Sequence, residues 1–396
     1  MTNFLIMAGV VLAGGLLLWP RLANATLWRA TITPLASIIG SGFLVLGPIL
    51  DVSYGAAAPF VMLALCAVAW LFGWAIRYNI ARIEATDRRS PLAERAETLA
   101  SAVLAFAYLI SVTYYLNLFG AFGVSLTALD DSYHARLLTT SVFLVVLAVG
   151  WSRGFSALER LEQVSVGLKL AIIAGLLVGL IVHFAQTAKA GALVLNPGTL
   201  TGWPALMLGA GLVVTVQGFE TSRYLGASYD SATRIRSMRM AQWLAAAIYM
   251  IYIVLLTYAF DPRVLTLDET SIIDLMEGVA PILPVLLVAA ALSAQFSAAV
   301  ADTNGSGGLV NELTRGLVTP RVAYAGVVGF GILLTWTADI FEIISYASRA
   351  FAAYYALQAG IAAVSARACN QKGRAVLFAL IAVGGALAAL FGKPVE

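Results

Sequence analysis

Apolar residues follow one another along this chain in runs of roughly 20, the length that an α-helix needs to cross the hydrocarbon core of a bilayer. Shorter stretches rich in polar and charged residues separate these runs. The pattern predicts an all-α integral membrane protein with about 12 transmembrane helices, because helices satisfy their own backbone hydrogen bonds in lipid. The expected segments cover residues 3–20, 30–50, 56–78, 98–127, 136–151, 162–184, 203–225, 239–260, 280–303, 321–337, 340–366 and 374–392.

Composition supports this class, and the charges give it an orientation. Hydrophobic residues make up 61% of the chain and charged residues only 11%, which excludes an ordinary soluble domain. Most Lys and Arg lie in alternate loops, among them 77–95 and 223–239. Because such loops stay in the cytoplasm, we predict a multi-pass protein of the inner or plasma membrane with both termini extracytoplasmic. The net charge of +3 reflects this topology, and nucleic acid is not an expected partner.

The expected segments fall into four parts. Residues 1–26 form a leader transmembrane helix, and no Lys or Arg precedes its apolar run, which argues against a cleaved signal. Two sets of five segments follow, in residues 27–200 and 201–370, and residues 371–396 form a C-terminal transmembrane helix. Because five is odd, the second set enters the membrane from the opposite side. Any repeat between the two sets is therefore inverted.

Each set begins with an interrupted apolar segment. The first interruption, Ile-Gly-Ser-Gly-Phe, covers residues 39–43, and the second, Gln-Gly-Phe-Glu-Thr, covers residues 217–221. Irregular backbone at membrane depth is tolerated where it lines a cavity enclosed by protein. Two broken segments at corresponding places in two halves are typical of a transporter's binding site.

The first interruption is a candidate anion site. Gly40, Ser41 and Gly42 leave helical geometry readily after Ile39 and expose backbone N–H groups. A half-helix beginning here would direct its positive N-terminal end into the cavity, where it favours a carboxylate. The alternative is that these small residues let two helices approach closely. The matching break in the other half favours the binding role.

The second interruption places a carboxylate, Glu220, well inside an expected span. Such a group is costly at membrane depth and marks either a pathway or a buried partner. It would hold the break open by accepting from unwound backbone N–H groups or an arginine, or it would bind an amine or a proton. Gln217 and Gly218 would offer backbone carbonyls beside it, and Phe219 an aromatic ring.

At both breaks the chain resembles a known family. The stretch Pro-Leu-Ala-Ser-Ile-Ile-Gly-Ser-Gly-Phe at 34–43 is similar to the first core helix of the amino acid–polyamine–organocation (APC) superfamily. Gly-Phe-Glu at 218–220 is similar to the sixth core helix. The resemblance implies the five-plus-five inverted-repeat fold of the leucine transporter, with Phe219 closing over the substrate. The leader helix, which also occurs in sodium–solute symporters of this fold, and the single tail helix depart from the common pattern.

The resemblance also bears on the coupling ion. Lys169 lies in the fifth core segment, where proton-coupled members carry a lysine amine in place of a bound sodium ion. Sodium-coupled members present two adjacent hydroxyls in the eighth core segment, whereas here Ser293 is followed by alanine. The resemblance therefore implies that Ala36, Ile39 and Ser293 supply oxygens to Lys169, and it favours protons over sodium. The alternative is that Lys169 extends to the cytoplasmic headgroups.

Asp302 has two interpretations of equal weight. It would pair with Lys169 or relay protons toward the cytoplasm. Alternatively, it would end a helix at the membrane surface, with Asn-Gly-Ser-Gly at 304–307 forming a loop.

The tenth core segment carries a polar stripe on one helical face, within residues 342–349. Tyr346 of this stripe is a candidate for contact with the substrate. Arg349 needs an acidic partner, for which Glu220 and Asp302 are the candidates. The stripe would form either a static network or a moving gate.

The predicted function is secondary active transport of an amino acid or a related small amine-bearing solute, coupled to protons, by alternating access. Transport of potassium or another inorganic ion on the same fold and sodium-coupled solute symport are the alternatives. The sequence contains no His-x-x-x-His metal set, nucleophile–base spacing or ATP-binding glycine loop, so no enzyme activity, metal or cofactor is expected. The expected partners are the small solute, protons and the lipid bilayer.

Overall fold

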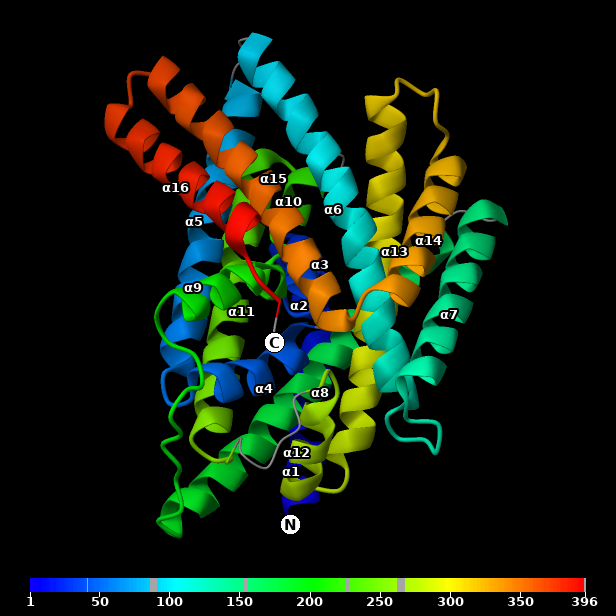
Figure 1. Cartoon of the computed structure of the whole chain (residues 1–396), viewed down its shortest axis with the longest axis vertical. Coiled ribbons are helices and arrows are strands. Elements are labelled where there is room, and N and C mark those ends of the chain that lie inside the picture. Colours follow the sequence, from blue (N-terminus) through cyan, green and yellow to red (C-terminus); the bar gives the residue numbers. More distant parts are fainter. Residues whose placement is uncertain (41, 86–90, 153–155, 226–227, 262–267, 395–396) are drawn as a thin grey trace.

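The computed structural model describes residues 1–396 except 41, 86–90, 153–155, 226–227, 262–267 and 395–396. The described chain is a bundle of helices (Figure 1). In chain order they are α1 (Thr2–Leu18), α2 (Pro20–Ala23), α3 (Thr26–Ile38), α4 (Gly42–Tyr54), α5 (Ala58–Ala85), α6 (Pro91–Val124), α7 (Ser132–Ser152), α8 (Ser156–Lys189), α9 (Gly202–Gly211), η1 (Val213–Val216), α10 (Thr221–Tyr224), α11 (Ser231–Thr257), α12 (Ser271–Val279), α13 (Leu283–Leu313), α14 (Pro320–Thr337), α15 (Ile340–Ala368) and α16 (Lys372–Phe391).

Each apolar segment expected from the sequence overlaps a helix or a broken helix of the described chain. Within that part of the chain, 7 helices are long and apolar enough to cross a membrane alone, or 8 with the bent pair α3 and α4 taken as one span. The apolar helix α1 is shorter, at 17 residues. The all-α membrane class is thus confirmed, whereas the number of about 12 crossings stays a prediction.

The first break lies where the glycine-containing segment predicts it. α3 ends at Ile38 and α4 begins at Gly42, and the two helices are bent by 45°. Ile39 leaves helical geometry, with ψ at 56°. In Figure 1, α4 lies across the direction of the long helices. The break therefore leaves backbone N–H and C=O groups without partners inside a helix.

The second break is longer and includes a short 3-10 helix. α9 ends at Gly211, η1 covers Val213–Val216, and α10 begins at Thr221. Between η1 and α10, Gly218 has φ at +115°, a conformation that residues with a side chain rarely adopt. Both interruptions expected from the sequence are therefore present.

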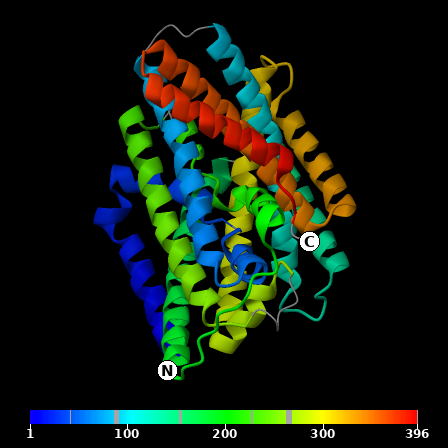
Figure 2. The same cartoon turned by 60° about the vertical axis from the view of Figure 1, so that its left-hand side comes forward.

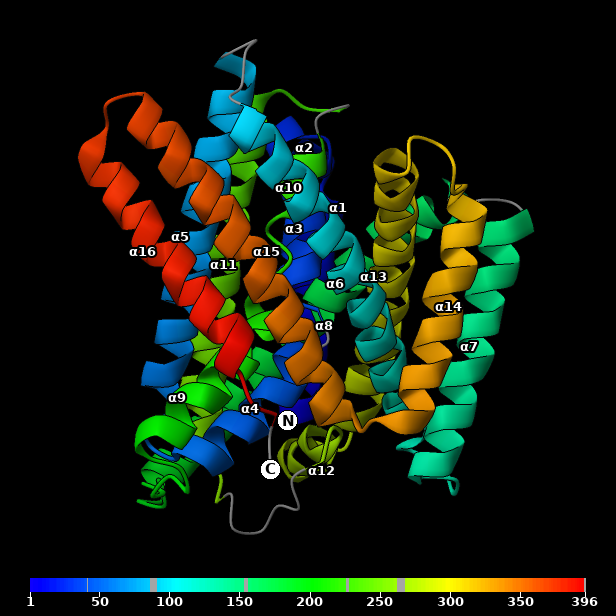
Figure 3. The ribbon, with the colours of Figure 1, turned by 45° about the horizontal axis from the view of Figure 1, so that its top comes forward.

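Long helices surround the two broken segments. α3 and α4 pack against α11, while η1 packs against α5 and α15. α1 packs along α8, and Figure 2 shows it at the edge of the bundle. Figure 3 shows α7 beside α14 at one edge and α16 beside α15 at the opposite edge. The breaks consequently lie within protein, where irregular backbone is tolerated at membrane depth.

The loop expected at 304–307 is wrong. α13 continues through these residues to Leu313. Glycine weakens a helix in isolation, but aromatic rings of neighbouring helices pack closely on this one, Tyr108 at Gly305 and Tyr324 at Gly307. Tertiary packing therefore overrides the local preference for a turn.

The predicted part boundaries fall at or near helix ends. The boundary at 26–27 lies at the start of α3, that at 200–201 precedes α9, and that at 370–371 precedes α16. The inverted repeat, the division into four parts and the extracytoplasmic placement of both termini stay predictions.

Candidate functional site

The two breaks are in direct contact through glycines. A Cβ atom on Gly218 would lie 2.5 Å from the carbonyl carbon of Ser37, and one on Gly42 would lie 2.9 Å from Thr215 Cα. Both distances are too short for non-bonded atoms, so no larger residue fits at either position without displacing the opposite break. The glycines therefore set the distance between the two broken segments.

A tyrosine of α11 joins the two breaks. The buried Tyr249 hydroxyl lies 3.0 Å from the backbone oxygen of Ile38 and 2.5 Å from that of Thr215. Its single proton can be donated to either carbonyl. Ile39 is also buried beside this contact, whereas Ser41 lies outside the described residues.

Glu220 is enclosed by groups of its own break and of α15. Its Oε2 accepts from the Gly218 N–H at 2.9 Å and from the Tyr355 hydroxyl at 2.7 Å. The Phe219 ring stacks on Tyr355, with 5.0 Å between centroids. Glu220 thus accepts from one unwound backbone N–H group, as the bridge requires, while its role at the break stays a prediction. The stacking places Phe219 in packing contact with α15.

Replacing Tyr355 with phenylalanine is expected to destabilise the protein by about 1–3 kcal/mol, because a buried carboxylate oxygen loses one of its donors. A lower midpoint of thermal unfolding in detergent would show this. Tyr346→Phe, on the same helix with a 40% exposed side chain, is the matched control and should leave the midpoint unchanged. Equal midpoints for Tyr355→Phe and the wild type would contradict the bridging role.

Gln217 presents a free amide oxygen at the second break. Its Nε2 donates to the Tyr115 hydroxyl of α6 at 3.0 Å. Its Oε1 is buried and has no hydrogen-bond partner within the described part of the chain. Buried acceptors are rarely left unpaired, so this oxygen is available to a donor supplied by a ligand.

Lys169 lies in the interior, at the contact that the sequence comparison implied. Its side chain is 4% exposed, and its Nζ donates to the backbone oxygen of Ala36 at 2.8 Å. The alternative in which it extends to the headgroups is therefore wrong. Ser293 is half-buried on α13. The oxygens expected from Ser293 and Ile39 and the coupling role of the lysine stay predictions.

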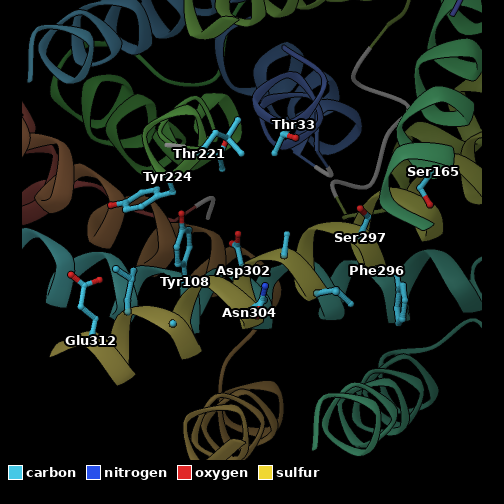
Figure 4. Close-up of a pocket in the computed structure, with 16 residues that line it drawn as sticks. Thr33, Tyr108, Ser165, Thr221, Tyr224, Phe296, Ser297, Asp302, Asn304 and Glu312 are labelled. Atoms are coloured by element: carbon cyan, nitrogen blue, oxygen red, sulfur yellow. The ribbon is translucent and has the colours of Figure 1, made fainter. Parts of the chain in front are cut away.

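A cavity of about 530 Å³ reaches the second break from one side (Figure 4). In this view, Tyr108 of α6 and Tyr224 of α10 lie on one side, with Ser165 of α8 and Ser297 of α13 on the other. Thr33 of α3 completes the wall next to the first broken helix. The cavity thus lies between both broken segments and the long helices α6, α8 and α13.

Two acidic side chains line this cavity. Asp302 and Glu312 line it, and no Lys or Arg is among the described lining residues. Asp302 also accepts a hydrogen bond from the Ser111 hydroxyl of α6. It lies inside α13 rather than at a helix end, so the surface interpretation of Asp302 is wrong. A solute with a cationic group would be favoured on the way through this cavity.

Arg349 of the polar stripe on α15 does not meet the breaks as expected, although Ser348 of the same helix accepts from Val214 N in η1 at 3.0 Å. Tyr346 is 40% exposed, and its contact with a substrate stays a prediction. Arg349 donates to the backbone oxygen of Ala389 in α16 at 2.8 Å, so the pairing expected with Glu220 or Asp302 is wrong. The arginine finds its hydrogen-bond acceptor on the neighbouring helix, because α16 packs along α15.

Sequence reasoning missed a charged cluster beside α10. Arg223 forms an ion pair with Glu97 of α6 and donates to Gln358 of α15, which also accepts from Asn79 of α5 at 2.9 Å. The cluster joins the short helix after the second break to three long helices. The sequence signals that could have indicated this pair were Glu97 at the edge of one apolar run and Arg223 at the edge of another.

Comparison with known proteins gives consistent results over the whole chain. A family model described as APC superfamily transporter matches residues 20–392. An uncharacterized protein of Aquifex aeolicus (strain VF5) is 38% identical over 406 aligned residues, covering 100% of this chain and 98% of that protein.

A solved structure shares the fold. It is the substrate-bound outward-open state of a Na⁺-coupled sialic acid symporter, with a TM-score of 0.53 and 12% sequence identity. The similarity covers 100% of this chain and 98% of that chain. At this identity, the likeness establishes the leucine-transporter type of fold and leaves the substrate and the coupling ion to other arguments.

Proposed function

This chain belongs to the APC superfamily of transporters, and we propose that it carries an amino acid or a related small amine-bearing solute, coupled to protons. The transported solute would bind between the two broken helices and leave through the cavity at Asp302. By the predicted topology, this cavity faces the cytoplasm.

The contact between the breaks supports a small zwitterionic solute. The first turn of α4, beginning at Gly42, offers backbone N–H groups that favour a carboxylate. The free Oε1 of Gln217 and the carboxylate of Asp302 favour an ammonium group. The first break would thus supply donors for the carboxylate, while the second break and α13 would supply acceptors for the ammonium group.

The observation that supports proton coupling is the hydrogen bond from the buried Lys169 Nζ to the backbone oxygen of Ala36, at 2.8 Å. An ammonium group has three N–H donors and needs about three hydrogen-bond acceptors, whereas a sodium ion needs more oxygen ligands around it. A buried lysine responds readily to its surroundings by gaining or losing a proton. Lys169 would bind a proton in one conformation and release it in another, so that proton movement drives the solute.

A thermal-shift screen of the purified protein tests the substrate class. The probes are single amino acids, simple amines, Na⁺ and K⁺, each at an acidic and a neutral pH. A ligand that binds the folded state raises its midpoint by mass action, so an amino acid is expected to raise it in sodium-free buffer. Stabilisation by K⁺ alone, or by amino acids only when Na⁺ is present, would overturn the proposal.

A further inference from the structure

The second half of the first broken segment, α4, contains a carboxylate that the proposed transport site does not use. Asp51 lies near the end of α4 and is 0% exposed. Neither of its side-chain oxygens has a hydrogen-bond partner within the described residues. A bare carboxylate in such a place is strongly unfavourable unless a proton or a cation neutralises it.

Within the described residues, which omit 262–267, the elements packed against α4 direct no positively charged side chain at Asp51. On α11, the Tyr252 hydroxyl reaches Gly47, one turn before Asp51 on the same face of α4, and donates instead to Leu44 O at 3.2 Å. Beyond α11, Asp261 acts electrostatically on Asp51 and is itself an acid. This neighbour therefore supplies no compensating positive charge to Asp51.

In the described part of the chain, the other elements packed against α4 place no basic side chain near Asp51. α12 carries Asp274 and Glu277, both exposed, while η1 has no titratable residue. α5 contributes only Cys66 in its half nearest α4, because Arg77 lies toward its far end. Neutralisation of Asp51 by a neighbouring side chain is therefore not available from these elements.

The chain segment 196–200 is hydrogen-bonded across the end of α4, and we call this segment the seal. The segment at 196–200 accepts from Ala56 N at 2.8 Å and donates from Leu200 N to Ser53 O at 2.9 Å. Asn196 also donates to Phe260 O at 3.1 Å, which joins the segment to the end of α11. Asp51 is thus enclosed on the α4 side of the first break. The cavity at Asp302 lies on the other side of this break, next to α3.

We propose that Asp51 is a second proton-binding site, occupied in this conformation and separate from Lys169. A proton binds to a single carboxylate oxygen without further ligands, and both oxygens of Asp51 lack a hydrogen-bond partner within the described residues. The four elements packed against α4 and the seal over its end would keep this proton from solvent until that seal parts.

Infrared spectroscopy of the purified protein tests this site without any transported solute. The wild type at neutral pH is expected to show the stretching band of a protonated carboxyl group, shifted in D₂O. Asp51→Asn, close in shape to the neutral acid, should lose this band. Asp51→Glu should move it, which keeps the test open if the asparagine variant does not fold. Asp274→Asn, on the adjacent helix α12, is the control and should leave the band unchanged.

Either of two results would overturn the assignment: a band unchanged in Asp51→Asn, or a band that Na⁺ removes at constant pH, which would indicate a metal-cation site. Because the measurement uses protein alone, its failure would leave the proposed role of Lys169 standing.

Discussion

Replacing Lys169 by alanine is expected to reduce proton-driven uptake of amino acids to the level of protein-free vesicles. The change removes the ammonium group that donates to Ala36 O and leaves this carbonyl at the first break without that donor. The conformational cycle would then lack the group whose protonation changes. The measurement is uptake of a labelled amino-acid mixture into proteoliposomes with an acidic exterior.

The matched control is Lys189→Ala, because this lysine is exposed at the end of the same helix, α8. Its uptake and its pH dependence should equal those of the wild type. Counterflow exchange at equal pH on both sides separates coupling from folding. Lys169→Ala protein that exchanges solute but ignores the gradient would support the coupling role, whereas an unchanged pH profile of uptake would reject it.

Replacing Gly218 by alanine is expected to have the largest effect on stability. A residue with a side chain at φ of +115° is strained by about 1–3 kcal/mol, and the added Cβ would overlap Ser37 at 2.5 Å, with overpacking of similar cost. The two breaks would have to separate. The measurements are the yield of monodisperse protein and the midpoint of thermal unfolding in detergent.

Gly326→Ala in α14 is the control, since within the described residues no atom outside the glycine's own stretch of helix lies within 4 Å of the position that its Cβ would occupy. Alanine favours a helix over glycine by up to about 1 kcal/mol, so this variant should be as stable as the wild type or slightly more so. If Gly218→Ala unfolded at the same temperature as Gly326→Ala, the close contact between the breaks would be refuted.

The sequence predicted the features that arise from local backbone chemistry. Helix length and apolar periodicity gave the membrane class, and glycines at 40 and 42 located the first break within one or two residues. The contact of Lys169 with Ala36 came from resemblance rather than from pattern, and the structure contains it. These features depend on short segments whose conformations are set by their own residues.

Features that depend on which helices become neighbours could not be predicted. Asn-Gly-Ser-Gly at 304–307 is a turn signal by composition, yet rings from other helices support it as helix. The helical face of Arg349 was evident, but a face does not reveal that α16 supplies its acceptor. Asp51 fell one residue beyond an expected span, so its burial was missed. Long-range packing decides all three cases.

The most direct test of the account is a pH-jump experiment on wild-type proteoliposomes that contain no sodium. Lowering the external pH should drive accumulation of labelled amino acid above its external concentration, and an uncoupler of the proton gradient should abolish it. Accumulation that requires Na⁺, or K⁺ flux with no response to any amino acid, would contradict proton-coupled transport of an amine-bearing solute.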